Sequence, residues 1–148
     1  MTEVKNAITS CFTSLSILET KGGDVLHAMK SGDPGFSGFG ESYFSTIKPG
    51  AIKGWKLHNE MVLNLVVPVG CIRFVIFDNR KGSKTEGEFG DFVLSRNNYG
   101  RLTVPPELWV GFQGIDAKDS LLLNIASIPH DPDESESKKL NEIDYDWG

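Results

Sequence analysis

The sequence is poor in cysteine and has no long apolar run. Its two cysteines, Cys11 and Cys71, lie sixty residues apart and form no Cys-x-x-Cys pair. This pattern does not indicate a disulfide framework, and we expect both to be free, buried thiols. No segment approaches the roughly 18 apolar residues of a membrane span, and the N-terminus lacks the basic and apolar regions of a signal peptide. We therefore predict a cytoplasmic protein.

Positive charge is also scarce. Fifteen Lys and Arg residues stand against twenty Asp and Glu residues, which gives a formal net charge of −5 at pH 7. Nucleic acids and anionic membranes are bound by basic surfaces that displace their counterions. We therefore expect neither as a partner, and any basic site on this chain must be local.

The chain is rich in short apolar segments separated by glycine and proline. Residues 61–77 predict a β-hairpin with a tight turn at residues 68–70, while residues 105–114 read as a connection whose apolar tip folds inward. Helical signals are limited to short stretches. They lie at residues 2–7 and 138–142, and further strands are expected within residues 23–30, 40–50, 91–94, 101–104 and 120–128. Seven to nine strands without crossover helices predict an all-β antiparallel sandwich or barrel, within one domain of residues 1–148.

The C-terminal tail differs in composition from the rest of the chain. Residues 131–142 are acidic and polar, so we expect this segment to be solvated. The tail ends with Ile143, Tyr145 and Trp147, whose apolar side chains we expect to dock on the body of the protein as an aromatic clasp.

Two motif spacings resemble those of the cupin superfamily. The first is Gly50-x5-Lys56-x-His58-x4-Leu63-x6-Gly70, and the second is residues 105–110. The cupin metal site has histidines at the positions of Lys56 and His58, a glutamate at Leu63 and a histidine at Val110. Because a single imidazole cannot hold a divalent ion tightly, we expect no metal and no other cofactor.

Five segments extend the resemblance over residues 24–148. In order, they are residues 38–44, 52–58, 66–80, 102–112 and 143–148. Together they resemble the dTDP-4-dehydrorhamnose 3,5-epimerase family, as a short and divergent member. The resemblance implies a cupin-type antiparallel β-sandwich or jelly-roll barrel with few or no helices. It also implies a nucleotide-sugar ligand, a role in surface-polysaccharide biosynthesis and a homodimer.

The residues that carry the chemistry in this family are replaced here. Epimerisation beside a keto group needs a base, an acid and a group that stabilises the enolate. In the family, the base is a histidine two residues after the glycine of an Arg-Gly pair, an aspartate supports it, and a tyrosine is the acid. Here the pair reads Lys53-Gly54, so the base position falls on Lys56. The tyrosine position falls on Leu123, a further lysine position falls on Leu63, and no equivalent of the aspartate is evident.

Catalysis by this chain would therefore rest on Lys56 and His58. The two alternate with Trp55 and Leu57 along a predicted strand, so they share one of its faces. The structural alternatives are a hydrogen-bonded His58 at the barrel mouth and solvated lysines at the strand end. The candidates for substrate binding are Lys53, Glu41, Tyr43, Trp109 and Asn124.

Three functions remain open from the sequence. The first is epimerisation or isomerisation of a 4-keto nucleotide sugar. The second is binding of a nucleotide sugar or other saccharide without turnover, because the usual acid and base positions are changed. The third is a structural barrel whose role is interaction, for example as a dimer partner in a polysaccharide-assembly set.

Overall fold

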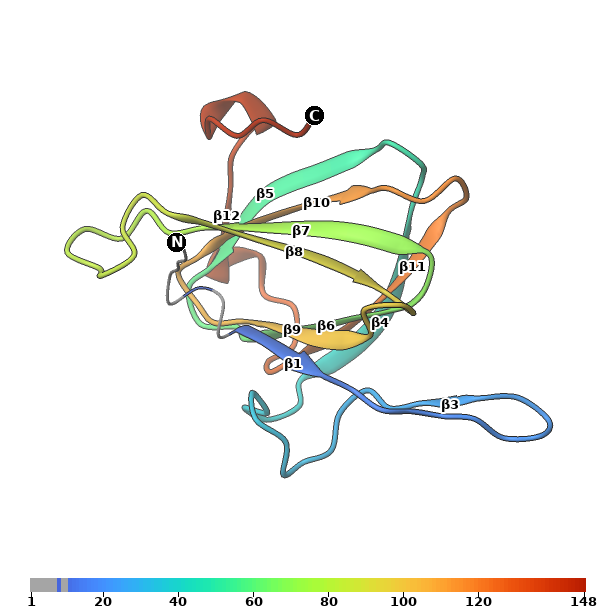
Figure 1. The fold of residues 1–148 in the computed structure, drawn as a ribbon. Coiled ribbons are helices and arrows are strands. Elements are labelled where there is room, and N and C mark those ends of the chain that lie inside the picture. Colours follow the sequence, from blue (N-terminus) through green and yellow to red (C-terminus); the bar gives the residue numbers. More distant parts are fainter. Residues whose placement is uncertain (1–7, 9–10) are drawn as a thin grey trace.

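The computed structural model describes residue 8 and residues 11–148, which form two antiparallel sheets packed face to face (Figure 1). The first sheet has the strand order β1-β9-β6-β11-β4 and the second has the order β12-β5-β10-β7-β8. Strands β2 and β3 form a separate ribbon that projects from the body (Figure 1). The predicted all-β cupin sandwich is therefore confirmed.

The strands are short, as the glycine and proline spacing predicted. They are β1 (Phe12–Ser14), β2 (Ile17–Leu18), β3 (Val25–Leu26), β4 (Glu41–Ile47), β5 (Ile52–His58), β6 (Leu63–Val69), β7 (Cys71–Phe77), β8 (Phe89–Ser95), β9 (Gly100–Val104), β10 (Trp109–Gly114), β11 (Ser120–Ala126) and β12 (Ser135–Ser137). Two 3₁₀ turns, η2 (Pro132–Glu134) and η3 (Leu140–Glu142), complete the tail. The second lies in the helical stretch expected at residues 138–142, whereas residues 2–7 lie outside the described residues.

The predicted hairpin at residues 61–77 is wrong. Strands β6 and β7 follow each other directly, but β6 pairs with β9 and β11 in the first sheet, while β7 pairs with β8 and β10 in the second. The chain changes sheets at Gly70, whose φ of 92° suits glycine and whose added Cβ would collide with Ser120. Both are interior strands of their sheets and are largely buried, and apart from Asn64 and Arg73 their residues are apolar.

The interpretation of residues 105–114 as a connection is also wrong. Their second half is β10, which lies between β5 and β7 in the second sheet. Pro105 and Pro106 precede this strand and therefore remove no hydrogen bond from its ladder. Glu107, which follows the two prolines and precedes the strand, has a positive φ of 70°.

Apolar side chains gather in two layers. The larger core fills the space between the sheets, and a second cluster covers the outer face of the second sheet around Trp55 and Trp109. The predicted clasp belongs to this outer cluster: Ile143 is buried, and the rings of Tyr145 and Trp147 lie 6.4 and 5.4 Å from that of Trp55. The tail is thus fixed to the back of β5.

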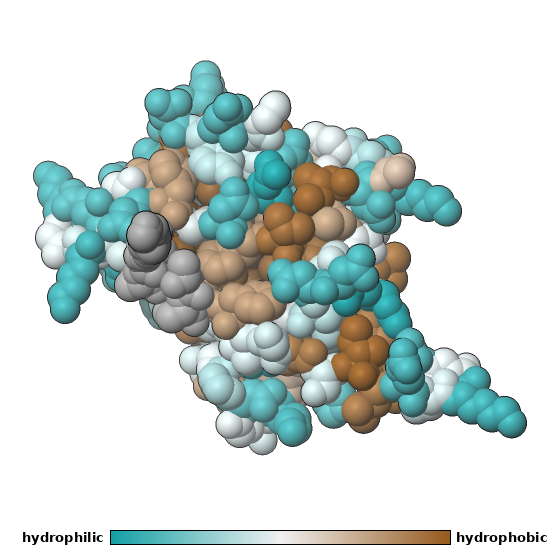
Figure 2. All heavy atoms as spheres, viewed as in Figure 1, coloured by the Kyte–Doolittle hydropathy of each residue, from teal (hydrophilic) through white to brown (hydrophobic). Residues whose placement is uncertain are grey.

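Some large apolar side chains remain exposed. They are Leu18, Val25, Phe36, Phe39, Tyr43, Phe44, Val69, Ile115 and Leu140. On the face seen in Figure 2, brown patches interrupt the hydrophilic surface. Among the described residues, no helix has the length and apolar character needed to cross a membrane.

Candidate active site

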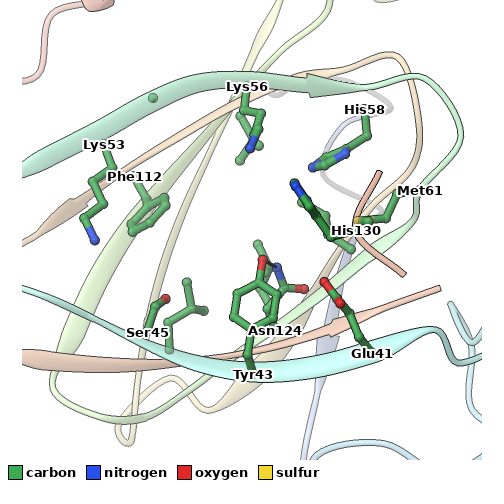
Figure 3. A pocket seen from close by; sticks show the side chains of 15 residues that line it. Glu41, Tyr43, Ser45, Lys53, Lys56, His58, Met61, Phe112, Asn124 and His130 are labelled. Atoms are coloured by element: carbon green, nitrogen blue, oxygen red, sulfur yellow. Dashed lines mark hydrogen bonds between the residues drawn. The ribbon is translucent and has the colours of Figure 1, made fainter. Parts of the chain in front are cut away.

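A cavity of about 310 Å³ lies between the two sheets (Figure 3). Its apolar lining consists of Met61, Leu63, Leu65, Val110, Phe112 and Leu122. Its polar side chains are Glu41, Tyr43, Ser45, Lys53, Lys56, His58, Asn124 and His130. One wall is β5 of the second sheet, and the facing wall is β4 and β11 of the first sheet.

The β5 wall carries three basic side chains, and a β-bulge brings one of them, Lys53, to the cavity. Strand alternation places Lys56 and His58 on one face, as predicted, but would turn Lys53 to the other face. The register with β10 shifts within this stretch, so that residues 54–55 oppose Gly111 alone. Such a two-against-one arrangement is a β-bulge, which re-aims the side chains beyond it. Lys53 therefore lines the same cavity as Lys56 and His58.

His58 is paired with a buried carboxylate. Its Nδ1 lies 2.7 Å from Oε1 of Glu134, and the two side chains are 12% and 3% exposed. The second oxygen of Glu134 accepts hydrogen bonds from the backbone N–H groups of Glu60 and Met61, each at 2.8 Å. Glu134 ends the turn η2, after which β12 pairs with β5 and places Ser135 opposite His58. The C-terminal tail thus delivers this carboxylate.

The contacts of Glu134 determine the state of the pair. Burial alone would raise the pKa of Glu134, but the hydrogen bond from His58, those from the two backbone amides and the nearby imidazole charge together hold it below its usual value. Glu134 is therefore a carboxylate at neutral pH and accepts a hydrogen bond from the N–H at Nδ1 of His58. In an imidazole whose single proton lies on Nδ1, Nε2 is an acceptor.

The two lysines of the wall are placed differently. Lys53 Nζ donates to the carbonyl oxygen of Thr46 at 3.0 Å, and Figure 3 shows it at the end of the cavity remote from His58. Lys56 points into the cavity between Lys53 and His58 (Figure 3). Lys56 has no hydrogen bond or ion pair with any described residue, so its ammonium group is available to an anionic ligand.

The facing wall carries a pair of polar side chains. Asn124 Nδ2 donates to the hydroxyl oxygen of Tyr43 at 2.9 Å, and the two residues lie directly opposite each other in the β11–β4 pairing. The Oδ1 atom of Asn124 is buried and has no hydrogen-bond partner among the described residues. A buried acceptor of this kind suits a hydroxyl group of a ligand.

The structure brings most of the sequence candidates together. Lys53, Lys56, His58, Glu41, Tyr43 and Asn124 all line the one cavity. Trp109 does not. It precedes the cavity residue Val110 on β10, so its ring faces outward, where it is 5% exposed and packs in the cluster around Trp55. Lys138 Nζ lies 5.2 Å from the centre of this ring. Trp109, a candidate for substrate binding from the sequence, therefore lies outside this cavity.

Sequence reasoning missed two residues of the site, Glu134 behind His58 and His130 in the cavity lining. Glu134 falls within the segment expected to be solvated; much of that segment is exposed, but Glu134 itself is 5% exposed. The start of a turn at Asp131-Pro132 is visible in the sequence, but no pattern there predicts that Glu134 is buried. His130 is exposed and also lines the cavity, on the side of Glu41 in Figure 3.

The described residues hold no candidate metal centre. No group of three or more His, Cys, Asp or Glu side chains among them is arranged to bind an ion. At the positions of the cupin metal ligands, the cavity presents Lys56, Leu63 and Val110 beside His58. An ammonium group and two apolar side chains are not metal ligands.

Comparison of sequences finds relatives in glycan biosynthesis. No family model matches the chain. The probable low-salt glycan biosynthesis epimerase Agl13 of Haloferax volcanii is 32% identical over 100 residues, which cover 67% of this chain and 64% of that protein. The spore coat polysaccharide biosynthesis protein SpsL of Bacillus subtilis is 24% identical over 113 residues, covering 74% and 75% of the two chains.

Comparison of structures gives more extensive matches. The crystal structure of a dTDP sugar isomerase from Desulfovibrio desulfuricans G20 matches with a TM-score of 0.88 and 38% identity, over 92% of this chain and 88% of that one. The dTDP-4-dehydrorhamnose 3,5-epimerase of Elizabethkingia anophelis shares the fold, with a TM-score of 0.81 and 19% identity over 97% and 84% of the chains. The chain therefore belongs to the family of the dTDP sugar isomerase and shares the fold of the dTDP-4-dehydrorhamnose 3,5-epimerase.

Proposed function

We propose that this protein epimerises or isomerises a 4-keto nucleotide sugar, with the His58–Glu134 pair as its base. The observation that carries the proposal is the 2.7 Å contact between these two side chains at the edge of the cavity. The relatives named for glycan and spore coat polysaccharide biosynthesis favour a role in supplying sugars to glycan assembly.

The reaction begins with removal of a proton from the carbon beside the keto group. Nε2 of His58 accepts this proton, and the carboxylate of Glu134 stabilises the imidazolium that forms. The sequence resemblance placed the base on Lys56, two residues earlier on the same face. We favour His58 because it has the carboxylate partner, whereas the positive charge of Lys56 suits stabilisation of the enolate.

Lys56 stabilises the enolate in this proposal. Loss of the proton shifts negative charge to the keto oxygen, and a fixed cation within a cavity of low polarity lowers the energy of that charge. Lys53 lies farther along the same wall and would contact the diphosphate, since a lysine binds phosphate as a point charge. The ligand would then lie with its sugar near His58 and its diphosphate toward Lys53.

Proton exchange tests the assignment. The protein is incubated with dTDP-4-keto-6-deoxyglucose in deuterated water, and loss of the proton signals beside the keto group is followed by NMR. We expect exchange with the native protein and a rate about 10³-fold lower for His58→Asn. His27→Asn, which changes a histidine outside the cavity, is the matched control. Exchange by His58→Asn at the native rate would overturn the assignment of the base.

The same assay separates catalysis from binding. A protein that binds the nucleotide sugar without turning it over would show ligand-induced stabilisation against heat and no exchange above background. That combination would favour the non-catalytic alternative, which the replacement of the family base and tyrosine positions by Lys56 and Leu123 also supports.

A homodimer is the proposed assembly. Strand β4 is the edge of the first sheet, and its outward-facing Phe44 is 65% exposed. Phe39, which precedes this strand, is 64% exposed. Exposed apolar residues at an open sheet edge favour pairing with a second copy. Light scattering should give twice the mass of one chain, and a monomeric mass would count against the dimer. The cytoplasmic location stays a prediction from the sequence.

A further inference from the structure

We infer that Tyr43 donates the second proton from the wall facing His58, that Asn124 positions it, and that the reaction therefore inverts the carbon. This inference rests on the proposed function. It assigns the acid to β4, a different strand from the one that carries the tyrosine position of the family, which falls on Leu123 of β11.

The contact between Asn124 and Tyr43 leaves the phenol proton free. Because the Asn124 amide donates to the phenol oxygen at 2.9 Å, it occupies an acceptor position of that oxygen and not its O–H. The O–H of Tyr43 can therefore point to a ligand in the cavity, where Figure 3 shows the ring directed toward the β5 wall. When the proton leaves, the same amide N–H stabilises the phenolate.

Asn124 itself is held in place. It is 7% exposed, and its strand neighbour across the sheet is Tyr43 itself. Asn124 lines the cavity and its Oδ1 has no partner among the described residues, so a sugar hydroxyl that donates to this atom would fix the ring close to the phenol. One amide thus orients both the acid and the ligand.

The two walls determine the stereochemistry. His58 belongs to the second sheet and Tyr43 to the first, so a flat enolate between them presents one face to each. His58 breaks the carbon–hydrogen bond on its side, and the electron pair moves into the enolate. Tyr43 then supplies a proton to the opposite face, which forms a new carbon–hydrogen bond of inverted configuration.

The proton balance closes without a further reactant. Tyr43 is 47% exposed, so its phenolate regains a proton from water, while the imidazolium of His58 releases one to water. No oxidant or reductant takes part. Reprotonation by His58 from its own side would return the original configuration, so removal of Tyr43 should separate exchange from inversion.

Tyr43→Phe tests this inference with two readouts. In deuterated water, we expect exchange beside the keto group to stay within about tenfold of the native rate, while formation of the epimer falls at least about 100-fold. Tyr99→Phe is the matched control, because the hydroxyl of Tyr99 donates to the His27 carbonyl away from the cavity. Epimer formation by Tyr43→Phe within threefold of the native rate would overturn the inference, and so would an equal loss of both readouts.

Asn124→Leu tests the positioning role. Loss of the amide N–H destabilises the phenolate, so we expect slower epimer formation and an alkaline limb of the kcat/KM profile displaced to higher pH. An unchanged profile would contradict the role of Asn124. Failure of the proposed function is distinguishable, because it appears as native exchange in His58→Asn, whereas failure of this inference appears as inversion by Tyr43→Phe.

Discussion

The two faces of β5 differ sharply. The inner face carries Lys56 and His58 in a partly polar cavity, and the outer face carries Trp55 and Leu57 in an aromatic cluster. The C-terminal tail contacts both: Glu134 pairs with His58 on the inner side, while Trp147 packs on Trp55 on the outer side. In addition, the indole N–H of Trp55 donates to the carbonyl of Leu140 at 3.3 Å.

This comparison teaches how a small sandwich fixes a reactive side chain. Apolar packing on the outer face of β5 does not involve the polar side chains on its inner face. The tail uses that packing to hold one carboxylate in a buried position, where an unanchored acidic segment would stay in water. Substitutions on each of the two faces test this account.

Trp55→Ala should have the largest effect. Trp55 is 1% exposed and forms the centre of the outer cluster, and truncation of such a residue costs about 3–5 kcal/mol. Urea unfolding followed by circular dichroism measures this loss. A change below about 1 kcal/mol would show that the tail is not anchored through this ring.

Glu134→Gln should leave the fold largely intact and impair the chemistry. Glutamine keeps the size of the side chain but removes the charge that orients His58 and stabilises its imidazolium, so we expect exchange to fall at least about 100-fold. Glu136→Gln, in the same tail but exposed, is the control. Equal rates in the two variants would contradict the pairing of His58 with Glu134.

The pH dependence of stability should also depend on Glu134. Its folded-state pKa lies below the unfolded value of about 4.3, so the carboxylate stabilises the fold fully above that pH. This contribution is lost as the pH falls through the folded-state pKa. Urea unfolding from pH 6 to 3 should show a shallower pH dependence in Glu134→Gln, and a matching dependence would refute this assignment.

Tyr145→Phe should have the smallest effect. The Tyr145 hydroxyl donates to Asp91 Oδ2 at 2.6 Å, and burial together with this bond raises the pKa of Tyr145 to about 12. The contribution is therefore present below about pH 10, the unfolded value, and is lost as the pH rises through 12. We expect a loss of about 1 kcal/mol at pH 7. Burial also raises the pKa of Tyr99, so an ultraviolet titration should show one fewer late-titrating tyrosine in the variant than in the native protein.

The sequence predicted local features better than pairings. Strand lengths, the shared face of Lys56 and His58 and the aromatic clasp all follow from alternation and composition, which act over a few residues. The hairpin at residues 61–77 was wrong because Gly70 turns the chain between sheets, and a turn motif does not specify the partners of the strands that it joins.

The candidate site was predictable in part for the same reason. Lys53 reaches the cavity through a bulge that no pattern in the sequence marks, and Trp109 faces outward because residues 105–114 include a strand. Glu134 was out of reach because its burial depends on contacts with His58 and residues 60–61, more than seventy positions away. Burial of a charge is decided by tertiary partners, not by the composition of its segment.

The most direct test of the account is deuterium incorporation beside the keto group of dTDP-4-keto-6-deoxyglucose, compared between the native protein and His58→Asn. If His58 with its partner Glu134 is the base, the native protein incorporates deuterium and His58→Asn does so about 10³-fold more slowly while remaining folded. Incorporation by His58→Asn at the native rate would contradict the central claim.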